Sequence, residues 1–564
     1  MSAQAIPVLI VGGGPVGLSL SIDLSWRGIP NLLVDCGAKI LRAEHPRMDQ
    51  VSIRSMEYAR RWGVVADIEA AGFPRTLSRD IVFTTGLLGR ELEREPVASD
   101  AARPPPPFSP QKHELCPQNF FDPVLQAIAE RSSIADIRYE HRLDSLSEDA
   151  DGVTAQITNL ATAETMAVRA QFVAGCDGAG STVARLIGVA ARGATLLAQS
   201  TNIFLRSPEL TARVAARPAY RHILVDETGA WGSMINMSGR DVWRLQVLGD
   251  LDRETWNEAR AKQIVDKAVG EPIAYDLLSI APWRRSELVV DRFSTDRCFL
   301  VGDAAHQLSP TGGYGMNTGI GEAVDLSWKL AAAIEGWAGP GLLASYDQER
   351  RPVALRNAAR GTLNFRRMRA VAGDRALFAD GDEGDAARER VGAAFRDTMA
   401  DEWDSMGIHL GYNYQDSPLI LPDDGPRIED DPVDYRQSSR PGGRAPHLWL
   451  ASGFSTLDLF GRGFVLLVFS DKADPKPLEL AAQSRSLPLE VVRVRNPEAV
   501  ELYERPLVLV RPDGHVAWRG TTAAHALAII DVVRGAGRAS PSVDGDAPRQ
   551  GEKLGAGAGP RDRA

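Results

Sequence analysis

The sequence contains little cysteine: its 564 residues include only Cys36, Cys116, Cys176 and Cys298. No two of them form a Cys-x-x-Cys pair, so the spacing indicates neither a redox-active dithiol nor a structural zinc site. We interpret the four side chains as reduced, buried thiols of a cytoplasmic protein. We predict no metal site.

Basic residues are also in the minority. The chain has 64 Lys and Arg against 74 Asp and Glu, a formal net charge of −10, and no block of basic residues. This balance argues against nucleic acid or an anionic membrane as a partner. No apolar run reaches the roughly 18 residues needed to cross a bilayer. The first residues, MSAQ, show neither the charged region nor the cleavage site of a secretory signal.

The first segment with a clear pattern is IPVLIVGGGPVGLSLSIDLSWRGIPNLLVDCG, residues 6–37. The continuous apolar run at 8–11 predicts a strand that is buried on both faces. A helix is expected from Pro15 towards Trp26, with Gly28 as its stop signal. Residues 32–34 predict a second strand, so the segment forms a βαβ unit.

The turn of this unit contains Gly12-x-Gly14-x-x-Gly17. Gly12 permits a tight turn, Gly14 lets the backbone approach a pyrophosphate, and Gly17 allows the helix to pack closely on the strand. Asp35 ends the second strand, where an acidic side chain binds a ribose diol. The pattern predicts dinucleotide binding rather than a glycine-rich packing turn, and leaves FAD and NAD open.

Two later motifs are GCDGAGSTVARLIG at 175–188 and VGDAAHQLSPTGGYGMNTGIGEAVDLSWKL at 301–330. With the first glycine motif, they resemble the three fingerprints of class A flavoprotein monooxygenases of the para-hydroxybenzoate hydroxylase and phenol hydroxylase type. The resemblance covers roughly residues 5–400, and the C-terminal part is similar to the longer phenol hydroxylase branch. It implies that the bound dinucleotide is FAD.

In the last motif, the resemblance places Asp303 against the ribityl chain of FAD. Pro310 and the glycines after it would pass beside the flavin ring. Gly315, Met316 and Asn317 would lead into a helix beginning near Thr318, whose N–H groups stabilise negative charge on the reduced ring. His306 is expected to be structural.

In the middle motif, Asp177, Gly178 and Arg185 resemble a segment that handles both FAD and NAD(P)H. An arginine there can pair with a carboxylate or a pyrophosphate. The family often has two adjacent arginines, whereas this chain has Ala184 before Arg185. The alternative for Arg185 is an ordinary surface ion pair.

The segment HPRMDQVSIRSMEYARRWG, residues 45–63, carries the candidates for catalysis. Arg47 resembles the residue that meets the mobile flavin ring, and Asp49 with Arg54 resembles the acid–arginine spacing of phenol hydroxylases. Asp49 near the ring would accept a phenol proton, directly or through water. The alternative is that Asp49 caps a helix beginning near Val51.

Two further positions come from the same resemblance. Gln118 aligns with a glutamine near the flavin. The tyrosine that phenol hydroxylases place beside the substrate has no match, although Gln246 falls near that position.

The fold class that follows is α/β, with a Rossmann-type FAD-binding domain, an inserted β-sheet substrate domain and a C-terminal thioredoxin-like domain. The C-terminal domain, without a cysteine pair, is expected to be structural or to contact a second copy in a homodimer. The predicted parts are an FAD-binding domain (1–195 and 285–400), a substrate-binding β-sheet layer (78–115 and 196–284), a linker (401–445), the thioredoxin-like domain (446–535) and a disordered tail (536–564).

We therefore predict an FAD-dependent hydroxylase of a small phenolic substrate. The resemblance implies that NADH or NADPH reduces FAD, that O2 forms a C4a-hydroperoxide on the flavin, and that the activated phenol ring attacks it. One alternative is a polyketide- or antibiotic-modifying monooxygenase of the same branch. Another is a non-catalytic flavoprotein that uses its C-terminal module for docking.

Overall fold

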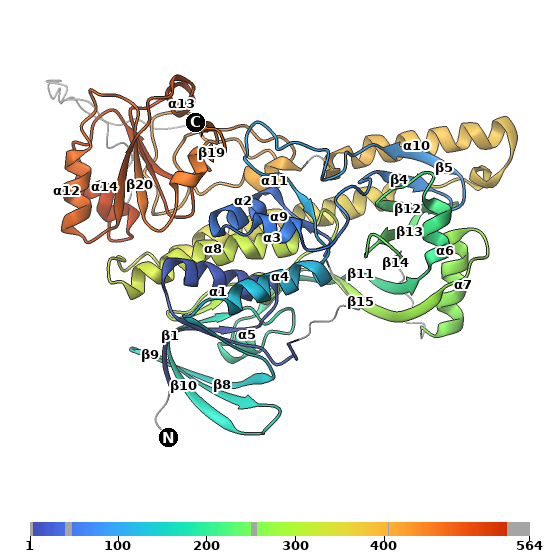
Figure 1. Ribbon diagram of the computed structural model, residues 1–564, viewed down its shortest axis with the longest axis horizontal. Helices are drawn as coiled ribbons and strands as arrows, with labels where there is room; N and C mark the ends of the chain where they lie inside the picture. Colours follow the sequence, from blue (N-terminus) through green and yellow to red (C-terminus); the bar gives the residue numbers. More distant parts are fainter. Residues whose placement is uncertain (1–3, 40–47, 250–255, 404, 538–564) are drawn as a thin grey trace, which may run out of the picture.

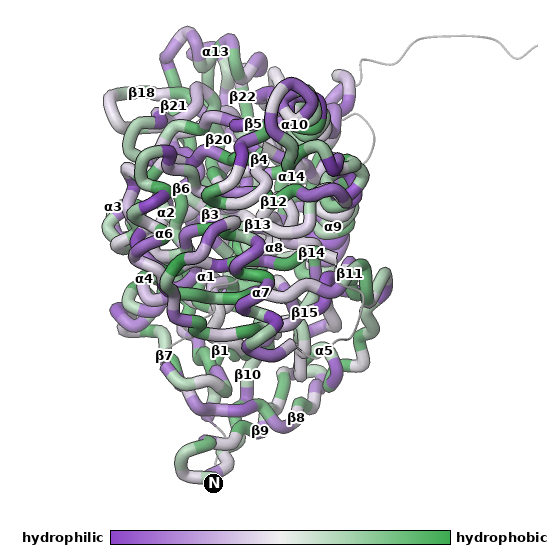
Figure 2. Tube along the Cα trace, turned by 90° about the vertical axis from the view of Figure 1, so that its right-hand side faces the viewer, coloured by the Kyte–Doolittle hydropathy of each residue, from purple (hydrophilic) through white to green (hydrophobic). Residues whose placement is uncertain are grey.

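The first β-sheet of the protein has a parallel core. The computed structural model describes residues 4–39, 48–249, 256–403 and 405–537. The parallel strands run in the order β7 (Ala135–Arg138), β2 (Asn31–Val34), β1 (Gln4–Val11), β10 (Thr165–Gly175) and β16 (Cys298–Leu300). β9 (Gly152–Asn159) pairs antiparallel with the first half of β10, and β8 (His141–Asp149) pairs with β9. Figure 2 shows β8 and β9 at the end of the molecule that carries the N-terminus.

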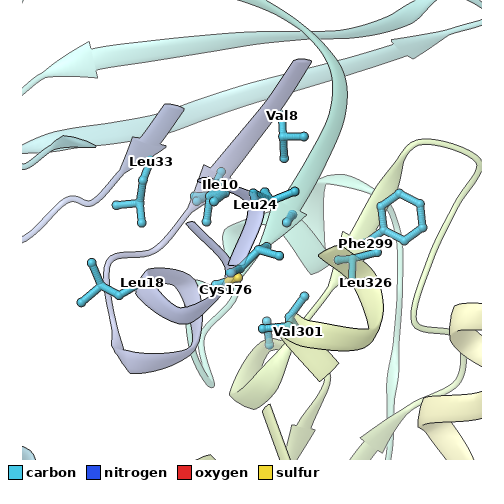
Figure 3. Packing of buried hydrophobic residues seen from close by; sticks show 14 of the residues in the cluster. Val8, Ile10, Leu18, Leu24, Leu33, Cys176, Phe299, Val301 and Leu326 are labelled. Atoms are coloured by element: carbon cyan, nitrogen blue, oxygen red, sulfur yellow. The ribbon is translucent and has the colours of Figure 1, made fainter. Parts of the chain in front are cut away.

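Helices α1 (Pro15–Arg27) and α8 (Tyr314–Ile334) pack against this sheet and against each other. Strands β1 and β2 contribute apolar side chains to a core that also holds Leu18 and Leu24 of α1 and Leu326 of α8 (Figure 3). The continuous apolar runs therefore form strands that are covered on both faces. α1 ends as predicted at Gly28, whose φ of 89° is the left-handed geometry of a helix C-cap.

The second sheet is mainly antiparallel and is inserted between parts of the first domain. Its strands, in spatial order, are β17 (His306–Gln307), β15 (Asp276–Val290), β11 (Ala191–Arg206), β14 (Val242–Leu248), β13 (Gly229–Asn236), β12 (Arg221–Asp226), β4 (Ile81–Thr84) and β5 (Glu91–Glu95). β11 and β15 extend a few residues beyond the predicted limits of 196 and 284. Their ends, with β17, connect this sheet to the first domain.

Helices cover both faces of the second sheet. Apolar residues of α6 (Pro208–Val214) and α7 (Glu258–Val269) pack on one face. Residues of α9 (Ser345–Ala370), the short turn η2 (Arg375–Phe378) and α10 (Gly381–Trp403) pack on the other. Figure 1 shows α10 running along the sheet beside β4 and β5.

Three helix starts differ from the predictions. α8 begins at Tyr314, not near Thr318, because Gly313 adopts φ 69° and serves as the N-cap. α2 (Ile53–Trp62) begins after Ser52, whose side chain accepts a hydrogen bond from the Ser55 N–H. The run NFFDPVLQAIAERS, residues 119–132, predicts a helix after Pro123, but α4 (Gln118–Glu130) begins five residues before that proline and contains it. The remaining short elements here are β3 (Gln50–Val51), α3 (Val65–Glu69), β6 (Glu114–Leu115), α5 (Thr182–Leu186), η1 (Gly302–Ala304) and α11 (Met406–Leu410).

The C-terminal domain has the thioredoxin topology that the sequence predicts. Its sheet has the order β21-β20-β22-β23, with β20 and β21 parallel and the other pairs antiparallel. The hairpin β18–β19 precedes it, and Figure 1 shows the domain at the end of the molecule opposite α6 and α7. The bounds are β18 (Trp449–Ala451), β19 (Phe454–Ser455), η3 (Thr456–Leu459), β20 (Phe464–Val468), α12 (Lys476–Ser484), β21 (Leu489–Arg493), α13 (Pro497–Tyr503), β22 (Leu507–Val510), β23 (Val516–Gly520) and α14 (Ala526–Val533).

The segment predicted as a linker contains little regular structure, but it is packed. Tyr412, Tyr414 and the run 419–421 are buried in one core with residues of α8 and of the thioredoxin-like domain. The predicted disordered tail lies, from residue 538 onward, outside the described residues. Within the described part of the chain, no helix combines the length and the hydrophobicity needed to cross a bilayer.

A buried cluster of charges also joins the C-terminal domain to the first domain. Arg511, which is 0% exposed, donates two hydrogen bonds to Glu349 of α9, at 2.6 and 2.8 Å. It also contacts Asp325 of α8 at 3.2 Å and Asp513 at 2.7 Å. Lys329 of α8 pairs with Asp325 and Glu349 at 2.8 and 2.6 Å. The domain is therefore fixed to α8 and α9 by charged contacts that exclude water.

Candidate active site

The carboxyl edge of the parallel sheet brings together four residues that the sequence selects. Gly12 directly follows β1 and Asp35 directly follows β2, while Asp177 and Asp303 lie in the turns after β10 and β16. Because these strands are parallel, their carboxyl ends meet at one edge. Cofactors of doubly wound folds bind at this edge.

The glycines of the first turn have two different roles. A Cβ atom on Gly12, whose φ is 110°, would lie 2.3 Å from the Cys176 carbonyl oxygen, and one on Gly17 would lie 1.9 Å from the Gly12 oxygen. These two glycines are required by packing. A Cβ on Gly14 would meet nothing within 4 Å, although Gly14 is the N-cap of α1. The open space beside this helix N-terminus fits a pyrophosphate, which the free N–H groups would bind.

Asp35 is held in place by the backbone around it. Its Oδ2 accepts a hydrogen bond from the Gly13 N–H and its Oδ1 one from the Gly37 N–H, both at 2.6 Å. Each carboxylate oxygen can still accept a second donor. The carboxylate is thus fixed beside the glycine turn, in the position expected for a ribose contact.

The middle motif uses its acidic residue to cap a helix. The Asp177 carboxylate accepts hydrogen bonds from the N–H groups of Thr182 and Val183, at 2.7 and 3.0 Å, at the start of α5. Gly178 follows with φ 80° and has open space around its Cα. Arg185 is exposed on α5. A contact of Asp177, Gly178 or Arg185 with FAD or NAD(P)H stays a prediction.

The turn that carries Asp303 is anchored from behind by α8. The buried Glu322 of α8 accepts a hydrogen bond from the Gly302 N–H at 2.8 Å and lies 2.8 Å from the Nε2 of His306. Burial opposes the charge on His306, but the Glu322 carboxylate raises its pKa above the ordinary value. His306 therefore has a structural contact, whereas Asp303 is exposed at the carboxyl edge.

The first turn of α8 contains Gly315, Met316 and Asn317, and Pro310 lies exposed in the loop before it. The Asn317 Oδ1 accepts hydrogen bonds from the Ser52 N–H and the Ser55 hydroxyl, both at 2.8 Å. Its Nδ2 donates to the carbonyl oxygens of Gln50 and Gly313, at 3.2 and 3.0 Å. Asn317 therefore ties the loop that precedes α8 to the start of α2.

Of two other predicted residues, the structure describes only one. Gln118 is the first residue of α4, and its Nε2 donates to Asp122 Oδ2 at 3.0 Å. Burial raises the pKa of Asp122 to about 7. Arg47 lies outside the described residues, so its prediction has no structural counterpart here.

Asp49 lies against two arginines of the second sheet. Its Oδ2 is 3.4 Å from Arg221 Nη2 and 3.6 Å from Arg244 Nη2, with Tyr220 beside it. Burial alone would raise the pKa of Asp49, but the two guanidinium groups and the Tyr220 hydroxyl bring it below the ordinary value. The alternative role as a helix cap is wrong, because Ser52 caps α2.

The residues around Asp49 were missed by sequence reasoning. Arg221, Arg244 and Arg285 come from β12, β14 and β15, and Glu402 comes from the last turn of α10. Arg221 begins the segment RHILVD and Arg244 lies within VWRLQVLG. Neither belongs to a motif, and the available signal was a charged residue in an otherwise apolar strand. Gln246 lies on β14 and bonds Asn202 at 3.4 Å.

The chain is similar to known proteins over most of its length. Residues 5–360 match the family described as FAD binding domain, and residues 438–535 match the family described as aromatic-ring hydroxylase, C-terminal. A solved structure of RebC, soaked with chromopyrrolic acid and holding 7-carboxy-K252c, superimposes with a TM-score of 0.89. Its sequence is 39% identical, and the match covers 95% of this chain and 100% of RebC.

Two curated proteins cover a similar extent. A 4-methyl-5-nitrocatechol 5-monooxygenase of Burkholderia sp is 30% identical, over 94% of this chain and 97% of its own. A tetracenomycin B2 monooxygenase-dioxygenase of Streptomyces olivaceus is 30% identical, over 93% of this chain and 97% of its own. The similarity therefore extends over most of the chain.

Proposed function

This chain belongs to the family of FAD-dependent aromatic hydroxylases, and from that premise we propose that it hydroxylates a phenolic compound with O2 and NADH or NADPH. One observation carries the proposal. Asp49, from the loop before β3, lies against Arg221 and Arg244 of the second sheet, with Asp49 and Arg244 buried and Arg221 partly buried. Such a group recognises a phenol oxygen by charge and hydrogen bonding.

The open space at Gly14 and the fixed Asp35 carboxylate fit the pyrophosphate and a ribose of FAD. Gly12, Gly14 and the N-terminus of α1 would hold the pyrophosphate, and Asp35 would hold the ribose. Asp303 would face the ribityl chain, and the loop before α8 would lie along the ring. Bound FAD would supply the transfer of electrons from NAD(P)H to O2 and of one oxygen atom to the substrate. Arg47, Gln118, Asp177 and Arg185 remain proposed contacts.

The proposal is tested by the oxidation of NADH and NADPH in the presence of candidate phenols. The FAD-loaded protein is mixed with salicylate, alkylphenols and polycyclic naphthols, and both product mass and hydrogen peroxide are recorded. A substrate should accelerate oxidation and gain one oxygen atom. If acceleration yields only hydrogen peroxide, that phenol is an effector and not the substrate. If no phenol has any effect on the FAD-loaded protein, the proposal is contradicted.

A second candidate is a polyketide- or antibiotic-modifying monooxygenase with a polycyclic phenol as substrate. The relatives named for tetracenomycin B2 and for RebC favour it. In the same panel, this candidate predicts a response to the polycyclic naphthols and none to single-ring phenols.

The C-terminal domain is proposed to be structural, because all four cysteines precede it and it has no redox pair. Self-association into a homodimer remains a prediction.

Replacing Asp49 by asparagine should lower kcat/KM for the phenol by about 10- to 100-fold, the loss of one hydrogen bond to a charged group. FAD affinity should stay unchanged, because Asp49 faces the second sheet. Steady-state kinetics with product detection measure the first effect, and fluorescence titration with FAD measures the second. The control is Asp144→Asn on β8, whose carboxylate pairs with Arg142 far from this group. An unchanged kcat/KM in Asp49→Asn contradicts the proposed role.

A further inference from the structure

Glu402 is a second buried carboxyl group next to the proposed substrate position. It lies in the last turn of α10 and is 6% exposed. Its Oε1 is 4.0 Å from Arg221 Nη1, and the backbone N–H of Gly312, in the loop before α8, faces its carboxylate. Glu402 therefore contacts both the substrate sheet and the loop that would lie along the flavin.

Arg221 lies between the two carboxyl groups. Its Nη2 is 3.4 Å from Asp49 and its Nη1 is 4.0 Å from Glu402. The other groups that face Glu402 are Arg285 from β15, Arg360 from α9 and Tyr314 from α8. The two acids are thus parts of one charge group, although 353 residues separate them in the sequence.

The environments of these acids differ in their effect on ionisation. Burial raises the pKa of Glu402 to about 7, against the opposing effect of Arg221 and Arg285. Asp49 has a lowered pKa because two guanidinium groups lie closer to it. When their surroundings give two neighbouring acids different pKa values, the acid whose pKa is near 7 is suited to accept and release a proton. The acid with the lowered pKa remains a fixed negative charge.

Polar atoms near Glu402 also lack partners. The Glu402 Oε2 is buried without a hydrogen bond in the described part of the chain, as are Arg285 Nε and Asn364 Oδ1. Arg285 is 1% exposed, and its Nη1 donates to the hydroxyl groups of Ser309 and Thr311, at 2.9 and 3.0 Å. Buried polar atoms of folded proteins are nearly always satisfied, so a cluster of exceptions indicates the position of a polar ligand.

We infer that Glu402 is the catalytic residue that removes the proton of the phenolic hydroxyl group, while Asp49 remains a fixed anion. This inference rests on the proposed function. The phenol O–H bond breaks, its electron pair stays on the phenol oxygen, and the proton forms a new O–H bond with Glu402 Oε2. The glutamic acid returns the proton to solvent after the product leaves.

Infrared difference spectroscopy of phenol binding tests the inference without turnover. The FAD-loaded protein, kept oxidised and without NAD(P)H, is mixed with phenol well above pH 7. A carbonyl band of a protonated carboxylic acid should appear in wild type and in the control Asp397→Asn, an exposed carboxylate of α10 that lies 3.8 Å from Arg396. The band should be absent in Glu402→Gln. Its absence from wild type, or its persistence in Glu402→Gln, overturns the inference.

Kinetics give the second readout. The wild-type kcat for hydroxylated product should rise with pH through a pKa of about 7, because Glu402 must be ionised to accept a proton. Glu402→Gln should no longer show this pH dependence. Its kcat should be about 100-fold lower than that of wild type, within the usual range for loss of a general base. The loss should be less than about threefold with 4-nitrophenol, which is more acidic and needs no base. Glu402→Asp should retain the pH dependence at a reduced rate.

The two proposals fail in different ways. If wild type hydroxylates no phenol, the proposed function is wrong, whatever the spectra show. If wild type hydroxylates a phenol and Glu402→Gln keeps the same pH profile and rate, only the role of Glu402 is wrong. An equal loss with 4-nitrophenol and with weakly acidic phenols also overturns it, because that result indicates a structural effect.

Discussion

Replacing Gly14 by alanine is expected to weaken FAD binding by about 100-fold, or about 2.7 kcal/mol, while the apoprotein stays nearly as stable as wild type. Gly14 has φ −74° and ψ 178°, which any residue adopts, and an added Cβ meets no protein atom within 4 Å. The new methyl group would therefore obstruct only a ligand. Losing about one charge-assisted hydrogen bond between the pyrophosphate and the α1 N-terminus accounts for this magnitude.

The measurement is a fluorescence titration of apoprotein with FAD, together with the melting temperature of the apoprotein. Gly28→Ala, at the other end of α1, is the matched control. Gly28 has φ 89° and equally open surroundings, so the change costs about 1–2 kcal/mol of backbone strain. It should lower the melting temperature and leave FAD affinity unchanged. Wild-type FAD affinity in Gly14→Ala would show that the pyrophosphate lies elsewhere.

Replacing Arg511 by leucine is expected to destabilise the protein by about 3–5 kcal/mol. Three buried carboxyl groups, those of Asp325, Glu349 and Asp513, surround this guanidinium group. Burial opposes the charge of Glu349, but Arg511 and Lys329 bring its pKa down to about 2. Without Arg511, Lys329 alone would compensate the charges of Asp325 and Glu349. An unpaired buried charge lowers the free energy of unfolding.

Thermal unfolding checks this expectation. For domains of this size the change corresponds to a melting temperature lower by roughly 6–20 °C. Arg505→Leu in the same domain is the control, because Arg505 forms an exposed pair with Asp424 at 3.5 Å. Such pairs contribute about 0–1 kcal/mol. Equal melting temperatures for the two variants would show that the buried cluster does not hold the domain in place.

The parts of the fold that were predictable from the sequence depend on local signals. The first βαβ unit has continuous apolar strands, a glycine turn and Gly28 as a stop, and the structure forms it at those residues. The thioredoxin-like domain shows the same kind of pattern, and its predicted topology is confirmed. Helix starts were less certain because a cap depends on one backbone angle. Because Gly313 adopts a left-handed conformation, α8 begins about one turn earlier in the sequence than predicted.

The substrate side of the candidate site could not be predicted in this way. Asp49, Arg221 and Glu402 come from a loop, a strand and a helix end that only tertiary structure brings together. No spacing rule connects an acid at position 49 with an arginine at 221. The packed segment around Tyr412 shows the same limitation, since its composition is typical of an exposed linker while its aromatic side chains are buried.

The buried charge cluster has a consequence for the order of events during synthesis. α8 begins at the loop proposed to lie along the flavin, and farther along it carries Asp325 and Lys329. Domains that emerge first from the ribosome generally fold first. Here Arg511 is translated 186 residues after Asp325, so α8 and α9 are synthesised before one of the two cations that compensate their buried acids. The packing of α8 and α9 is therefore expected to become final only after the C-terminal domain has folded against them.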